Sequence, residues 1–199
     1  MKIVLGSESP RRRELLSSMG FVFRTLKPEI DESFDSSLKL ETIAEFLSFK
    51  KSDALIHKID ADEILICSDT IVLLEDEIIG KPKDKKEAKN ILLKLSGKTH
   101  FVITGVTIRN KEKHITFQDK TEVTFNKLSD SEIDSYLKTN DAMDKAGAYG
   151  IQDWIGMIGV QKINGSYTNV MGLPTSKLYL AINNFYIKKG EFNRPFLSK

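Results

Sequence analysis

The amino-acid sequence predicts an α/β protein with a mixed sheet, arranged in two lobes around a central cleft. Short apolar runs alternate with amphipathic segments along the chain, which is typical of this class. Two long runs of alternating polarity lie next to each other and predict an antiparallel hairpin. No internal repeat or linker-like stretch interrupts the 199 residues, so we expect one domain spanning residues 1–199.

In the first half of the chain, helix caps and turn residues separate the apolar runs. Ser9 and Pro10 are typical of a helix start and Gly20 of its end. The stretch 29–40 is acidic, rich in hydroxyl groups and without a period, which predicts a loop. The elements expected here are a strand Lys2–Leu5, a helix from Ser9 to Gly20, a strand Phe21–Leu26, the loop Glu29–Leu40, a helix from Ile43 to about His57, a buried strand Glu63–Ser68, and a small hairpin of Ile71–Leu74 with Glu77–Ile79.

The second half begins with the clearest helix, whose apolar residues all fall on one face. Ser129 and Glu132 have the spacing of a capping box at the start of another helix. The elements expected here are a helix Asp84–Leu95, a long hairpin of Phe101–Arg109 with His114–Phe125, the helix after Ser129, an irregular segment Asn140–Gln152, short strands Met157–Lys162 and Tyr167–Val170, a terminal helix Pro174–Ile187, and a loosely held tail after Gly190.

The composition excludes several classes of protein. Thirty Lys and Arg against 28 Asp and Glu leave a net charge of +2, too little for a protein that coats a nucleic-acid duplex. The single cysteine, Cys67, cannot form an internal disulfide and indicates a reducing compartment. No apolar run approaches the roughly 18–20 residues of a membrane span. We therefore expect a cytoplasmic protein without nucleic-acid or membrane partners, in which a local cluster of cations binds any anion.

Three consecutive arginines, Arg11, Arg12 and Arg13, stand at the start of the first predicted helix. Cations there oppose the helix dipole, so an anionic ligand explains them better than helix stability does. A glycine turn with two serines precedes them, and the free N–H groups of a helix N-terminus suit an anion. Guanidinium groups bind phosphate through two hydrogen bonds. We interpret this segment as an anion site rather than a solvated helix end.

Four charged residues elsewhere, in three segments, are weaker candidates. Asp69 follows a buried apolar run, and ligands of α/β proteins bind beyond the carboxyl ends of strands, although a turn-forming aspartate is equally compatible. Lys81 stands in a rigid Gly-Lys-Pro turn and could contact a phosphate, although lysines in turns are usually only solvated. Asp31 and Glu32 could hold a hard cation, although a surface loop is the simpler interpretation.

Two further positions are notable for their place in the predicted elements. Lys51 lies on the flank of the apolar stripe of its helix. Gln152 ends a segment of small residues that lets the backbone approach a ligand, and its amide can both donate and accept, as the edge of uracil or thymine requires. The three histidines lack the spacing of a metal site, and the common glycine-rich nucleotide motifs are absent.

Taken together, these segments resemble the Maf family of nucleoside triphosphate pyrophosphatases from Lys2 to about Leu180. The family usually has alanine where this chain has Gly6, and since both are small the change is expected to be harmless. The motifs that carry the resemblance are Ser7-Glu8-Ser9-Pro10-Arg11-Arg12, Asp31-Glu32, Ser68-Asp69-Thr70, Gly80-Lys81-Pro82, Leu95-Ser96-Gly97-Lys98-Thr99-His100, Thr104-Gly105-Val106, Asp144-Lys145-Ala146-Gly147-Ala148-Tyr149-Gly150-Ile151-Gln152 and Gly172-Leu173-Pro174.

The resemblance implies a fold related to the inosine triphosphatase group. It also implies hydrolysis of a nucleoside triphosphate to the monophosphate and pyrophosphate, with Mg²⁺ or Mn²⁺. The implied roles are Asp69 as catalytic residue, general base or metal ligand; Glu32, with Asp69, near the metal; Ser7, Arg12, Lys51 (with Lys50 as the alternative) and Lys81 on the phosphates; and Arg11, Thr70 and Gln152 as the combination of the branch that acts on dTTP and UTP.

Two alternatives remain beside this reading. A sister branch acts on methylated GTP and differs at the three specificity positions, while the chemistry is the same. A nucleotide-binding regulator of septum formation, without significant turnover, would use the same cleft for binding only. A homodimer is the assembly expected beside these alternatives.

Overall fold

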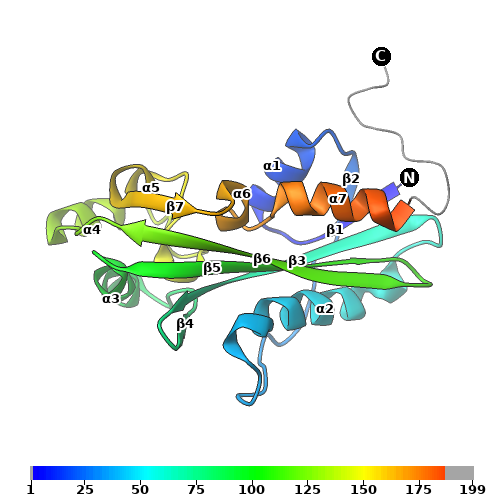
Figure 1. The fold of residues 1–199 in the computed structure, drawn as a ribbon, viewed down its shortest axis with the longest axis horizontal. Helices are drawn as coiled ribbons and strands as arrows, with labels where there is room; N and C mark the ends of the chain where they lie inside the picture. The colour runs from blue at the N-terminus through cyan, green and yellow to red at the C-terminus, as the bar shows by residue number, and fades with distance from the viewer. Residues whose placement is uncertain (1, 187–199) are drawn as a thin grey trace.

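The computed structural model describes residues 2–186, which fold around one seven-stranded mixed sheet (Figure 1). The sheet has the strand order β2-β1-β3-β5-β6-β7, and β4 adds to β3. This confirms the α/β class. The strands are β1 (Lys2–Gly6), β2 (Phe23–Thr25), β3 (Glu63–Leu74), β4 (Glu77–Ile79), β5 (Thr99–Arg109), β6 (His114–Phe125) and β7 (Val160–Asn164).

The helices cover both faces of the sheet at one end and cluster together at the other (Figure 1). Helix α2 lies below the sheet and α1 and α7 lie above it, while α3, α4 and α5 gather at the far end. No helix within residues 2–186 is long and apolar enough to cross a membrane. The helices are α1 (Pro10–Ser18), α2 (Ile43–Leu55), α3 (Lys85–Leu95), α4 (Asp130–Tyr136), α5 (Trp154–Gly159), α6 (Tyr167–Val170) and α7 (Thr175–Tyr186), with short 3-10 turns η1 (Leu40–Thr42), η2 (Ile56–Lys58) and η3 (Ala146–Ala148).

Local sequence signals set the ends of several helices as expected. The Ser9 side chain accepts a hydrogen bond from the Arg12 N–H, with Pro10 as the first helical residue. Ser129 and Glu132 form the complete capping box of α4. These caps satisfy N–H groups that a helix cannot pair internally, so they define where α1 and α4 begin.

The apolar core among the described residues divides into four clusters, and the two with the most members lie at the two ends of the sheet, as expected for two lobes. Leu5, Ile66 and Leu178 belong to a cluster under α1 and α7. Phe125 and Leu92 belong to the cluster at the far end, among α3, α4 and α5. The long strands β3, β5 and β6 pass through both lobes and join them.

Strand β3 has an interrupted edge that creates the cleft. Its first part, Glu63 to Cys67, pairs with β1 in parallel, and its last part, Val72 to Leu74, pairs antiparallel with β4 on the same side. The opposite edge of β3 pairs continuously with β5. Among the residues described, the stretch 68–71 therefore has no strand partner on the open side. This gap contains the Ser-Asp-Thr motif and lies directly beyond the carboxyl end of β1.

Two glycines allow close contacts near this gap. A Cβ at Gly105 would lie within 3 Å of the Ala44 backbone, so glycine is required for α2 to pack against β5. A Cβ at Gly6 would lie within 3 Å of Cys67 Sγ and 2.9 Å from Leu55 Cδ1. Glycine therefore fits this position, whereas alanine would not fit without a shift, because the Cys67 side chain fills the space of the methyl group.

Four sequence predictions differ from the structure. The predicted strands 63–68 and 71–74 are one continuous strand, because pairing with β5 carries the backbone through the polar motif. The predicted strand Met157–Lys162 begins as the end of α5 and only becomes a strand at Val160. The predicted strand Tyr167–Val170 is helix α6, capped by Ser166, whose side chain accepts from the Asn169 N–H. The predicted strand Phe21–Leu26 is shortened to β2. The predicted tail after Gly190 and the last residue of the helix Pro174–Ile187 lie outside the described residues.

Candidate active site

A cavity of about 300 Å³ opens at the gap in β3, a volume at the lower end of the range for small-molecule sites. Its walls come from α1, the loop before α2, α2 itself, β3, β4 and the segments 144–152 and 170–172. Ser7 does not line it but is buried beside it. The sequence-predicted residues that the cavity brings together are Arg11, Arg12, Glu32, Lys51, Asp69, Thr70, Lys81 and Gln152.

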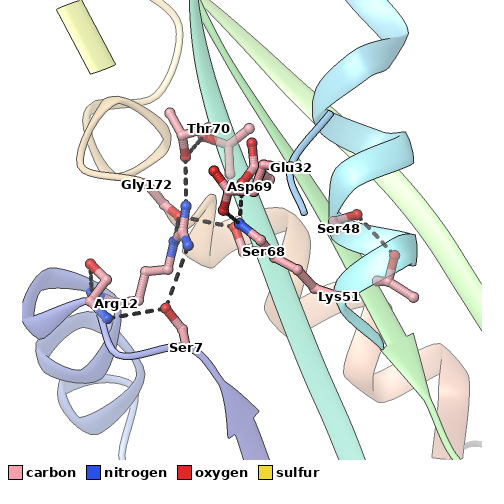
Figure 2. A network of polar contacts seen from close by, with 12 residues as sticks. Ser7, Arg12, Glu32, Ser48, Lys51, Ser68, Asp69, Thr70 and Gly172 are labelled. Atoms are coloured by element: carbon pink, nitrogen blue, oxygen red, sulfur yellow. Dashed lines mark hydrogen bonds and ion pairs between the residues drawn. The ribbon is translucent and has the colours of Figure 1, made fainter. Parts of the chain in front are cut away.

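Alternation along β3 sends neighbouring side chains of the motif to opposite faces of the sheet. Asp69 points toward α2, where it forms an ion pair with Lys51 Nζ (Figure 2). Thr70 points the other way, toward α1, and its Oγ1 accepts a hydrogen bond from Arg12 Nη2 at 3.0 Å. Because the edge of the strand is open between them, one cavity reaches both side chains.

Two carboxylates converge on one lysine at the α2 side of the cavity. Lys51 Nζ pairs with Asp69 and lies 2.7 Å from Glu32 Oε1, and its side chain is only 8% exposed (Figure 2). Burial alone would raise the pKa of Glu32, but the hydrogen bond and charge of Lys51 outweigh it and lower that pKa. Glu32 is therefore a carboxylate at neutral pH. The two acids and the cation between them form one charged cluster at this side of the cavity.

Arg12 is held by neutral groups on three sides (Figure 2). Its guanidinium donates to the Gly172 carbonyl oxygen at 2.9 Å, to Thr70 and, at 3.5 Å, to Ser7 Oγ. Burial lowers the pKa of Arg12, although an arginine remains charged in proteins. Within residues 2–186 no carboxylate forms an ion pair with it, so its positive charge remains available to an anion.

The remaining cations separate into those that line the cavity and those that do not. Arg13 is exposed and points away, because it lies about 100° further around α1 than Arg12. The expectation that all three arginines converge on the cleft is therefore wrong for Arg13.

Lys51 lines the cavity, whereas Lys50 donates to the Ser33 carbonyl at 3.0 Å. Lys81 lines the cavity from the turn after β4.

The segment that ends at Gln152 forms the opposite wall. Gln152 Oε1 is buried without a hydrogen-bond partner among the described residues, and a buried amide oxygen of this kind indicates a missing donor. The N–H of Gly147 donates to the Gly80 carbonyl at 3.2 Å, which ties this wall to the turn carrying Lys81. Ala148 has a φ of 58°, an uncommon conformation for a residue with a side chain.

Sequence reasoning missed several residues of the cleft. Asp144 pairs with Arg11 at 2.8 Å and lines the cavity, but in the sequence it is one acid in a glycine-bearing segment. Tyr149 lines the cavity as well, and its hydroxyl lies 2.8 Å from Nε2 of the fully buried His100. Burial lowers the pKa of His100 to about 4. Phe34, two residues after Glu32, adds an apolar face. Only the fold brings Asp144 beside Arg11 and Tyr149 beside His100, since the partners in each pair come from distant parts of the chain.

The donor set of the cavity suits a hard divalent cation that is bound together with a substrate. Within the described residues no cluster of three or more His, Cys, Asp or Glu side chains forms. Glu32 and Asp69 nevertheless meet at one point that already attracts a positive group, Lys51 Nζ. Mg²⁺ is commonly bound by one or two carboxylates together with substrate phosphates, so two acids are a sufficient protein contribution.

Comparisons with known proteins agree with the motifs. A family model described as "Maf-like protein" matches residues 2–185. A protein of Phocaeicola vulgatus named dTTP/UTP pyrophosphatase is 49% identical over 180 residues, covering 89% of this chain and 93% of that protein. Proteins with the same name from Flavobacterium psychrophilum and Porphyromonas gingivalis are 46% and 44% identical, each covering 92% of this chain and 94% of the relative. The Ham1 protein of Staphylococcus aureus, a solved structure, is similar with a TM-score of 0.49 and 12% identity, covering 93% of this chain and 99% of that one. With a family model over nearly the whole chain and relatives near half identity, the chain belongs to the Maf family.

Proposed function

We propose that this protein hydrolyses dTTP and UTP to the nucleoside monophosphate and pyrophosphate. One observation carries the proposal: a single cavity joins two converging carboxylates, Glu32 and Asp69, to the cations Arg12, Lys51 and Lys81. Relatives at 44–49% identity that are named dTTP/UTP pyrophosphatase support the same reaction and the same bases.

The cations of the cavity would bind the triphosphate. A nucleoside triphosphate brings about four negative charges, and attack at phosphorus requires them to be neutralised. Arg12 offers a charge that no carboxylate within residues 2–186 neutralises, and it approaches from the α1 side. Lys51 and Lys81 approach from α2 and from the turn after β4. Ser7 Oγ accepts a hydrogen bond from Arg12 Nη1 and so helps to orient this guanidinium.

Glu32 and Asp69 would hold a divalent cation, Mg²⁺ or Mn²⁺, together with the phosphates of the substrate. When bound, such a cation supplies charge neutralisation and lowers the pKa of a coordinated water. Lys51 Nζ keeps the two carboxylates close together, and their mutual repulsion is reduced by its charge. The support is the donor set itself, which has two acids and no softer ligand.

Asp69 would accept the proton of the attacking water or bind the cation. Water attacks the α-phosphorus, a new P–O bond forms, and the bond to the bridging oxygen breaks so that pyrophosphate leaves. A carboxylate beside the attacking water accepts its proton, which is the role of a general base. Asp69 is the buried acid of the pair, and its position at the open edge of β3 exposes it to the cavity.

Gln152, Thr70 and Arg11 would select the base. The unpaired Gln152 Oε1 can accept from the ring N–H of uracil or thymine, while its amide N–H can donate to the neighbouring carbonyl. Thr70 Oγ1 is engaged by Arg12 and lies 3.0 Å from Thr104 Oγ1, so its orientation is defined. The Gln152 amide supports a base with a carbonyl beside an N–H, and the names of the relatives support a pyrimidine among such bases.

The test is a panel of purified nucleotides with Mg²⁺ or Mn²⁺. We expect dTTP and UTP to give monophosphate and pyrophosphate, and Asp69→Asn to lose about 10²–10⁴-fold in kcat. Asp76→Asn, the same change at an exposed turn of the next hairpin, should retain full activity. Release of orthophosphate alone would contradict the reaction type, and a preference for methylated GTP would contradict the base assignment. Tight binding without turnover over hours would indicate the regulator instead.

We further propose a cytoplasmic location and a single domain. The lone cysteine supports a reducing compartment, and in the fold it is fully buried, with its pKa raised by burial to about 12. The one continuous sheet that joins both lobes supports a single unit.

A further inference from the structure

Two neighbouring arginines line the cavity but have different partners. Arg12 donates only to neutral oxygens, those of Gly172, Thr70 and Ser7. Arg11 Nη1 instead donates to Asp144 Oδ2 at 2.8 Å and forms an ion pair with it. One guanidinium therefore presents a free charge to the cavity, while the charge of the other is neutralised.

Asp144 is itself held in place. Lys145 Nζ lies 3.0 Å from Asp144 Oδ1 and 3.2 Å from Asp153 Oδ2, and the Lys145 side chain is 9% exposed. Burial alone would raise the pKa of Asp144, but the hydrogen bonds from Arg11 and Lys145 outweigh it and lower that pKa. The group facing Arg11 is thus an anchored carboxylate rather than a freely rotating one.

The pair joins two segments that are far apart in the sequence and lie on different walls of the cavity. Arg11 comes from the first turn of α1, and Asp144 comes from the segment that also supplies Gln152. The Arg11 side chain is 19% exposed, so most of its surface is covered by the protein. A guanidinium has five N–H donors in a fixed plane, and one hydrogen bond at Nη1 therefore orients the others.

We propose that Asp144 is a positioning residue for recognition of the pyrimidine base. By neutralising Arg11 and holding one of its nitrogens, it keeps this guanidinium from the triphosphate and directs its free N–H groups to a carbonyl oxygen of the base. The inference rests on the function proposed above. It assigns the two arginines separate tasks, with Arg12 for phosphate and Arg11 for the base, and names the acid that separates them.

The variants Asp144→Asn and Asp144→Ala test this assignment. The Asp144 side chain is 55% exposed, so the ion pair contributes little to stability and both variants should fold. Asp141→Asn is the matched control, because it makes the same charge change in the same segment, and its side chain lies outside the cavity. The measurements are kcat/KM for dTTP and for GTP, the Kd of inorganic pyrophosphate by calorimetry, and Tm.

Asp144→Ala should lower the preference for dTTP over GTP about tenfold, the loss expected for one charge-assisted hydrogen bond. Asp144→Asn should lower it less, since an amide oxygen still accepts from Arg11. Both variants should lower the Kd of pyrophosphate about twofold or more, because the freed Arg11 charge then attracts it. In an Arg11→Ala background the Asp144→Asn change should lower the Kd of pyrophosphate by less than it does when Arg11 is present, because only the loss of the carboxylate charge and the release of Lys145 remain, and Asp141→Asn should alter neither quantity.

A parallel loss of kcat/KM for both nucleotides, with an unchanged ratio and an unchanged Kd of pyrophosphate, would overturn the assignment and leave Asp144 a merely structural residue. If the wild-type protein hydrolyses no nucleotide, the proposed function fails. The pyrophosphate titration still tests in that case whether Asp144 neutralises Arg11, because it needs no turnover: equal Kd values for wild type and Asp144→Asn refute the inference.

Discussion

Gly6→Ala is the substitution that most directly tests how the floor of the cleft is packed. Gly6 pairs with Cys67 in the register of β1 and β3, one residue before Ser7. A Cβ there would lie within 3 Å of Cys67 Sγ and 2.9 Å from Leu55 Cδ1, whereas apolar atoms rest about 3.5–4.0 Å apart. Gly6 does not have a positive φ, so space and not backbone strain excludes the methyl group.

The magnitude follows from two opposing effects. Overpacking a fully buried site by one methyl group costs about 1–3 kcal/mol. Replacing glycine restricts the unfolded chain and returns about 0.4–1 kcal/mol. The net loss of unfolding free energy should be about 1–2 kcal/mol, which lowers Tm by about 3–6 °C for a chain of this size.

Cys67→Ala removes the sulfur that occupies this space and supplies the control. Alone it should destabilise by about 1 kcal/mol, because it leaves a small cavity. In that background Gly6→Ala should be nearly neutral, since its nearest remaining neighbour is the flexible end of Leu55. The coupling energy in this cycle should therefore be about 1–2 kcal/mol in favour of the double variant.

The assay is urea unfolding of the four proteins at one temperature, with the slope m compared to verify that the same surface is exposed. Equal losses from Gly6→Ala in both backgrounds would refute the steric argument, because the sulfur would then be irrelevant. A wild-type Tm in the single variant Gly6→Ala would refute it as well. The expected result shows that glycine at this position and the size of the facing Cys67 side chain depend on each other.

Three further predictions concern charges and the cleft wall. Lys51→Met should lower Tm at pH 7 by several degrees, because two close carboxylates lose their common cation. Millimolar Mg²⁺ should restore part of the lost Tm, and no recovery would contradict a cation site shared by Glu32 and Asp69. Arg24 donates to Glu63, and chiefly this hydrogen bond lowers the pKa of Glu63 to about 2. The ionised Glu63 therefore stabilises the folded protein fully above the pKa that it has in the unfolded chain, and this contribution is lost as the pH falls toward 2. Glu63→Gln should thus lower Tm at pH 7 and flatten its decline between pH 5 and 2, as thermal scans across pH would show. His100→Phe should raise KM by loosening Tyr149, without changing the pH profile between 6 and 8, since His100 with a pKa of about 4 is neutral there.

The secondary structure could be predicted wherever periodicity and caps agree. The helix 84–95 and the long hairpin appear close to the expected bounds, as α3, β5 and β6. The failures lie where tertiary contacts decide. Helix α6 contains Asn169, whose buried amide donates to the Val102 carbonyl at 3.0 Å and to Thr121 at 2.9 Å. Those partners come from β5 and β6, so no local pattern in 167–170 could have revealed them.

The same distinction separates the parts of the site. Sequence motifs identified Asp69 and Arg12, and the structure brings them to one cavity. The sequence placed Asp69 at the end of a strand, and the structure places it in the middle of β3, beyond the end of β1. The motif lies there because a strand whose edge is free for four residues can expose polar side chains on both faces while its other edge remains paired.

The geometry of α1 explains why three consecutive arginines lie in three different environments. A helix turns about 100° per residue, so Arg11, Arg12 and Arg13 face different surroundings although they are adjacent in the sequence. Arg12 meets the open edge of β3 through Thr70, Arg11 meets the wall that carries Asp144, and Arg13 meets solvent. Their charge is the same, and what each can bind depends on whether a carboxylate has already neutralised it. A cluster of like residues in a motif therefore does not imply a common role, and the partner that divides the roles here lies 133 residues away in the sequence.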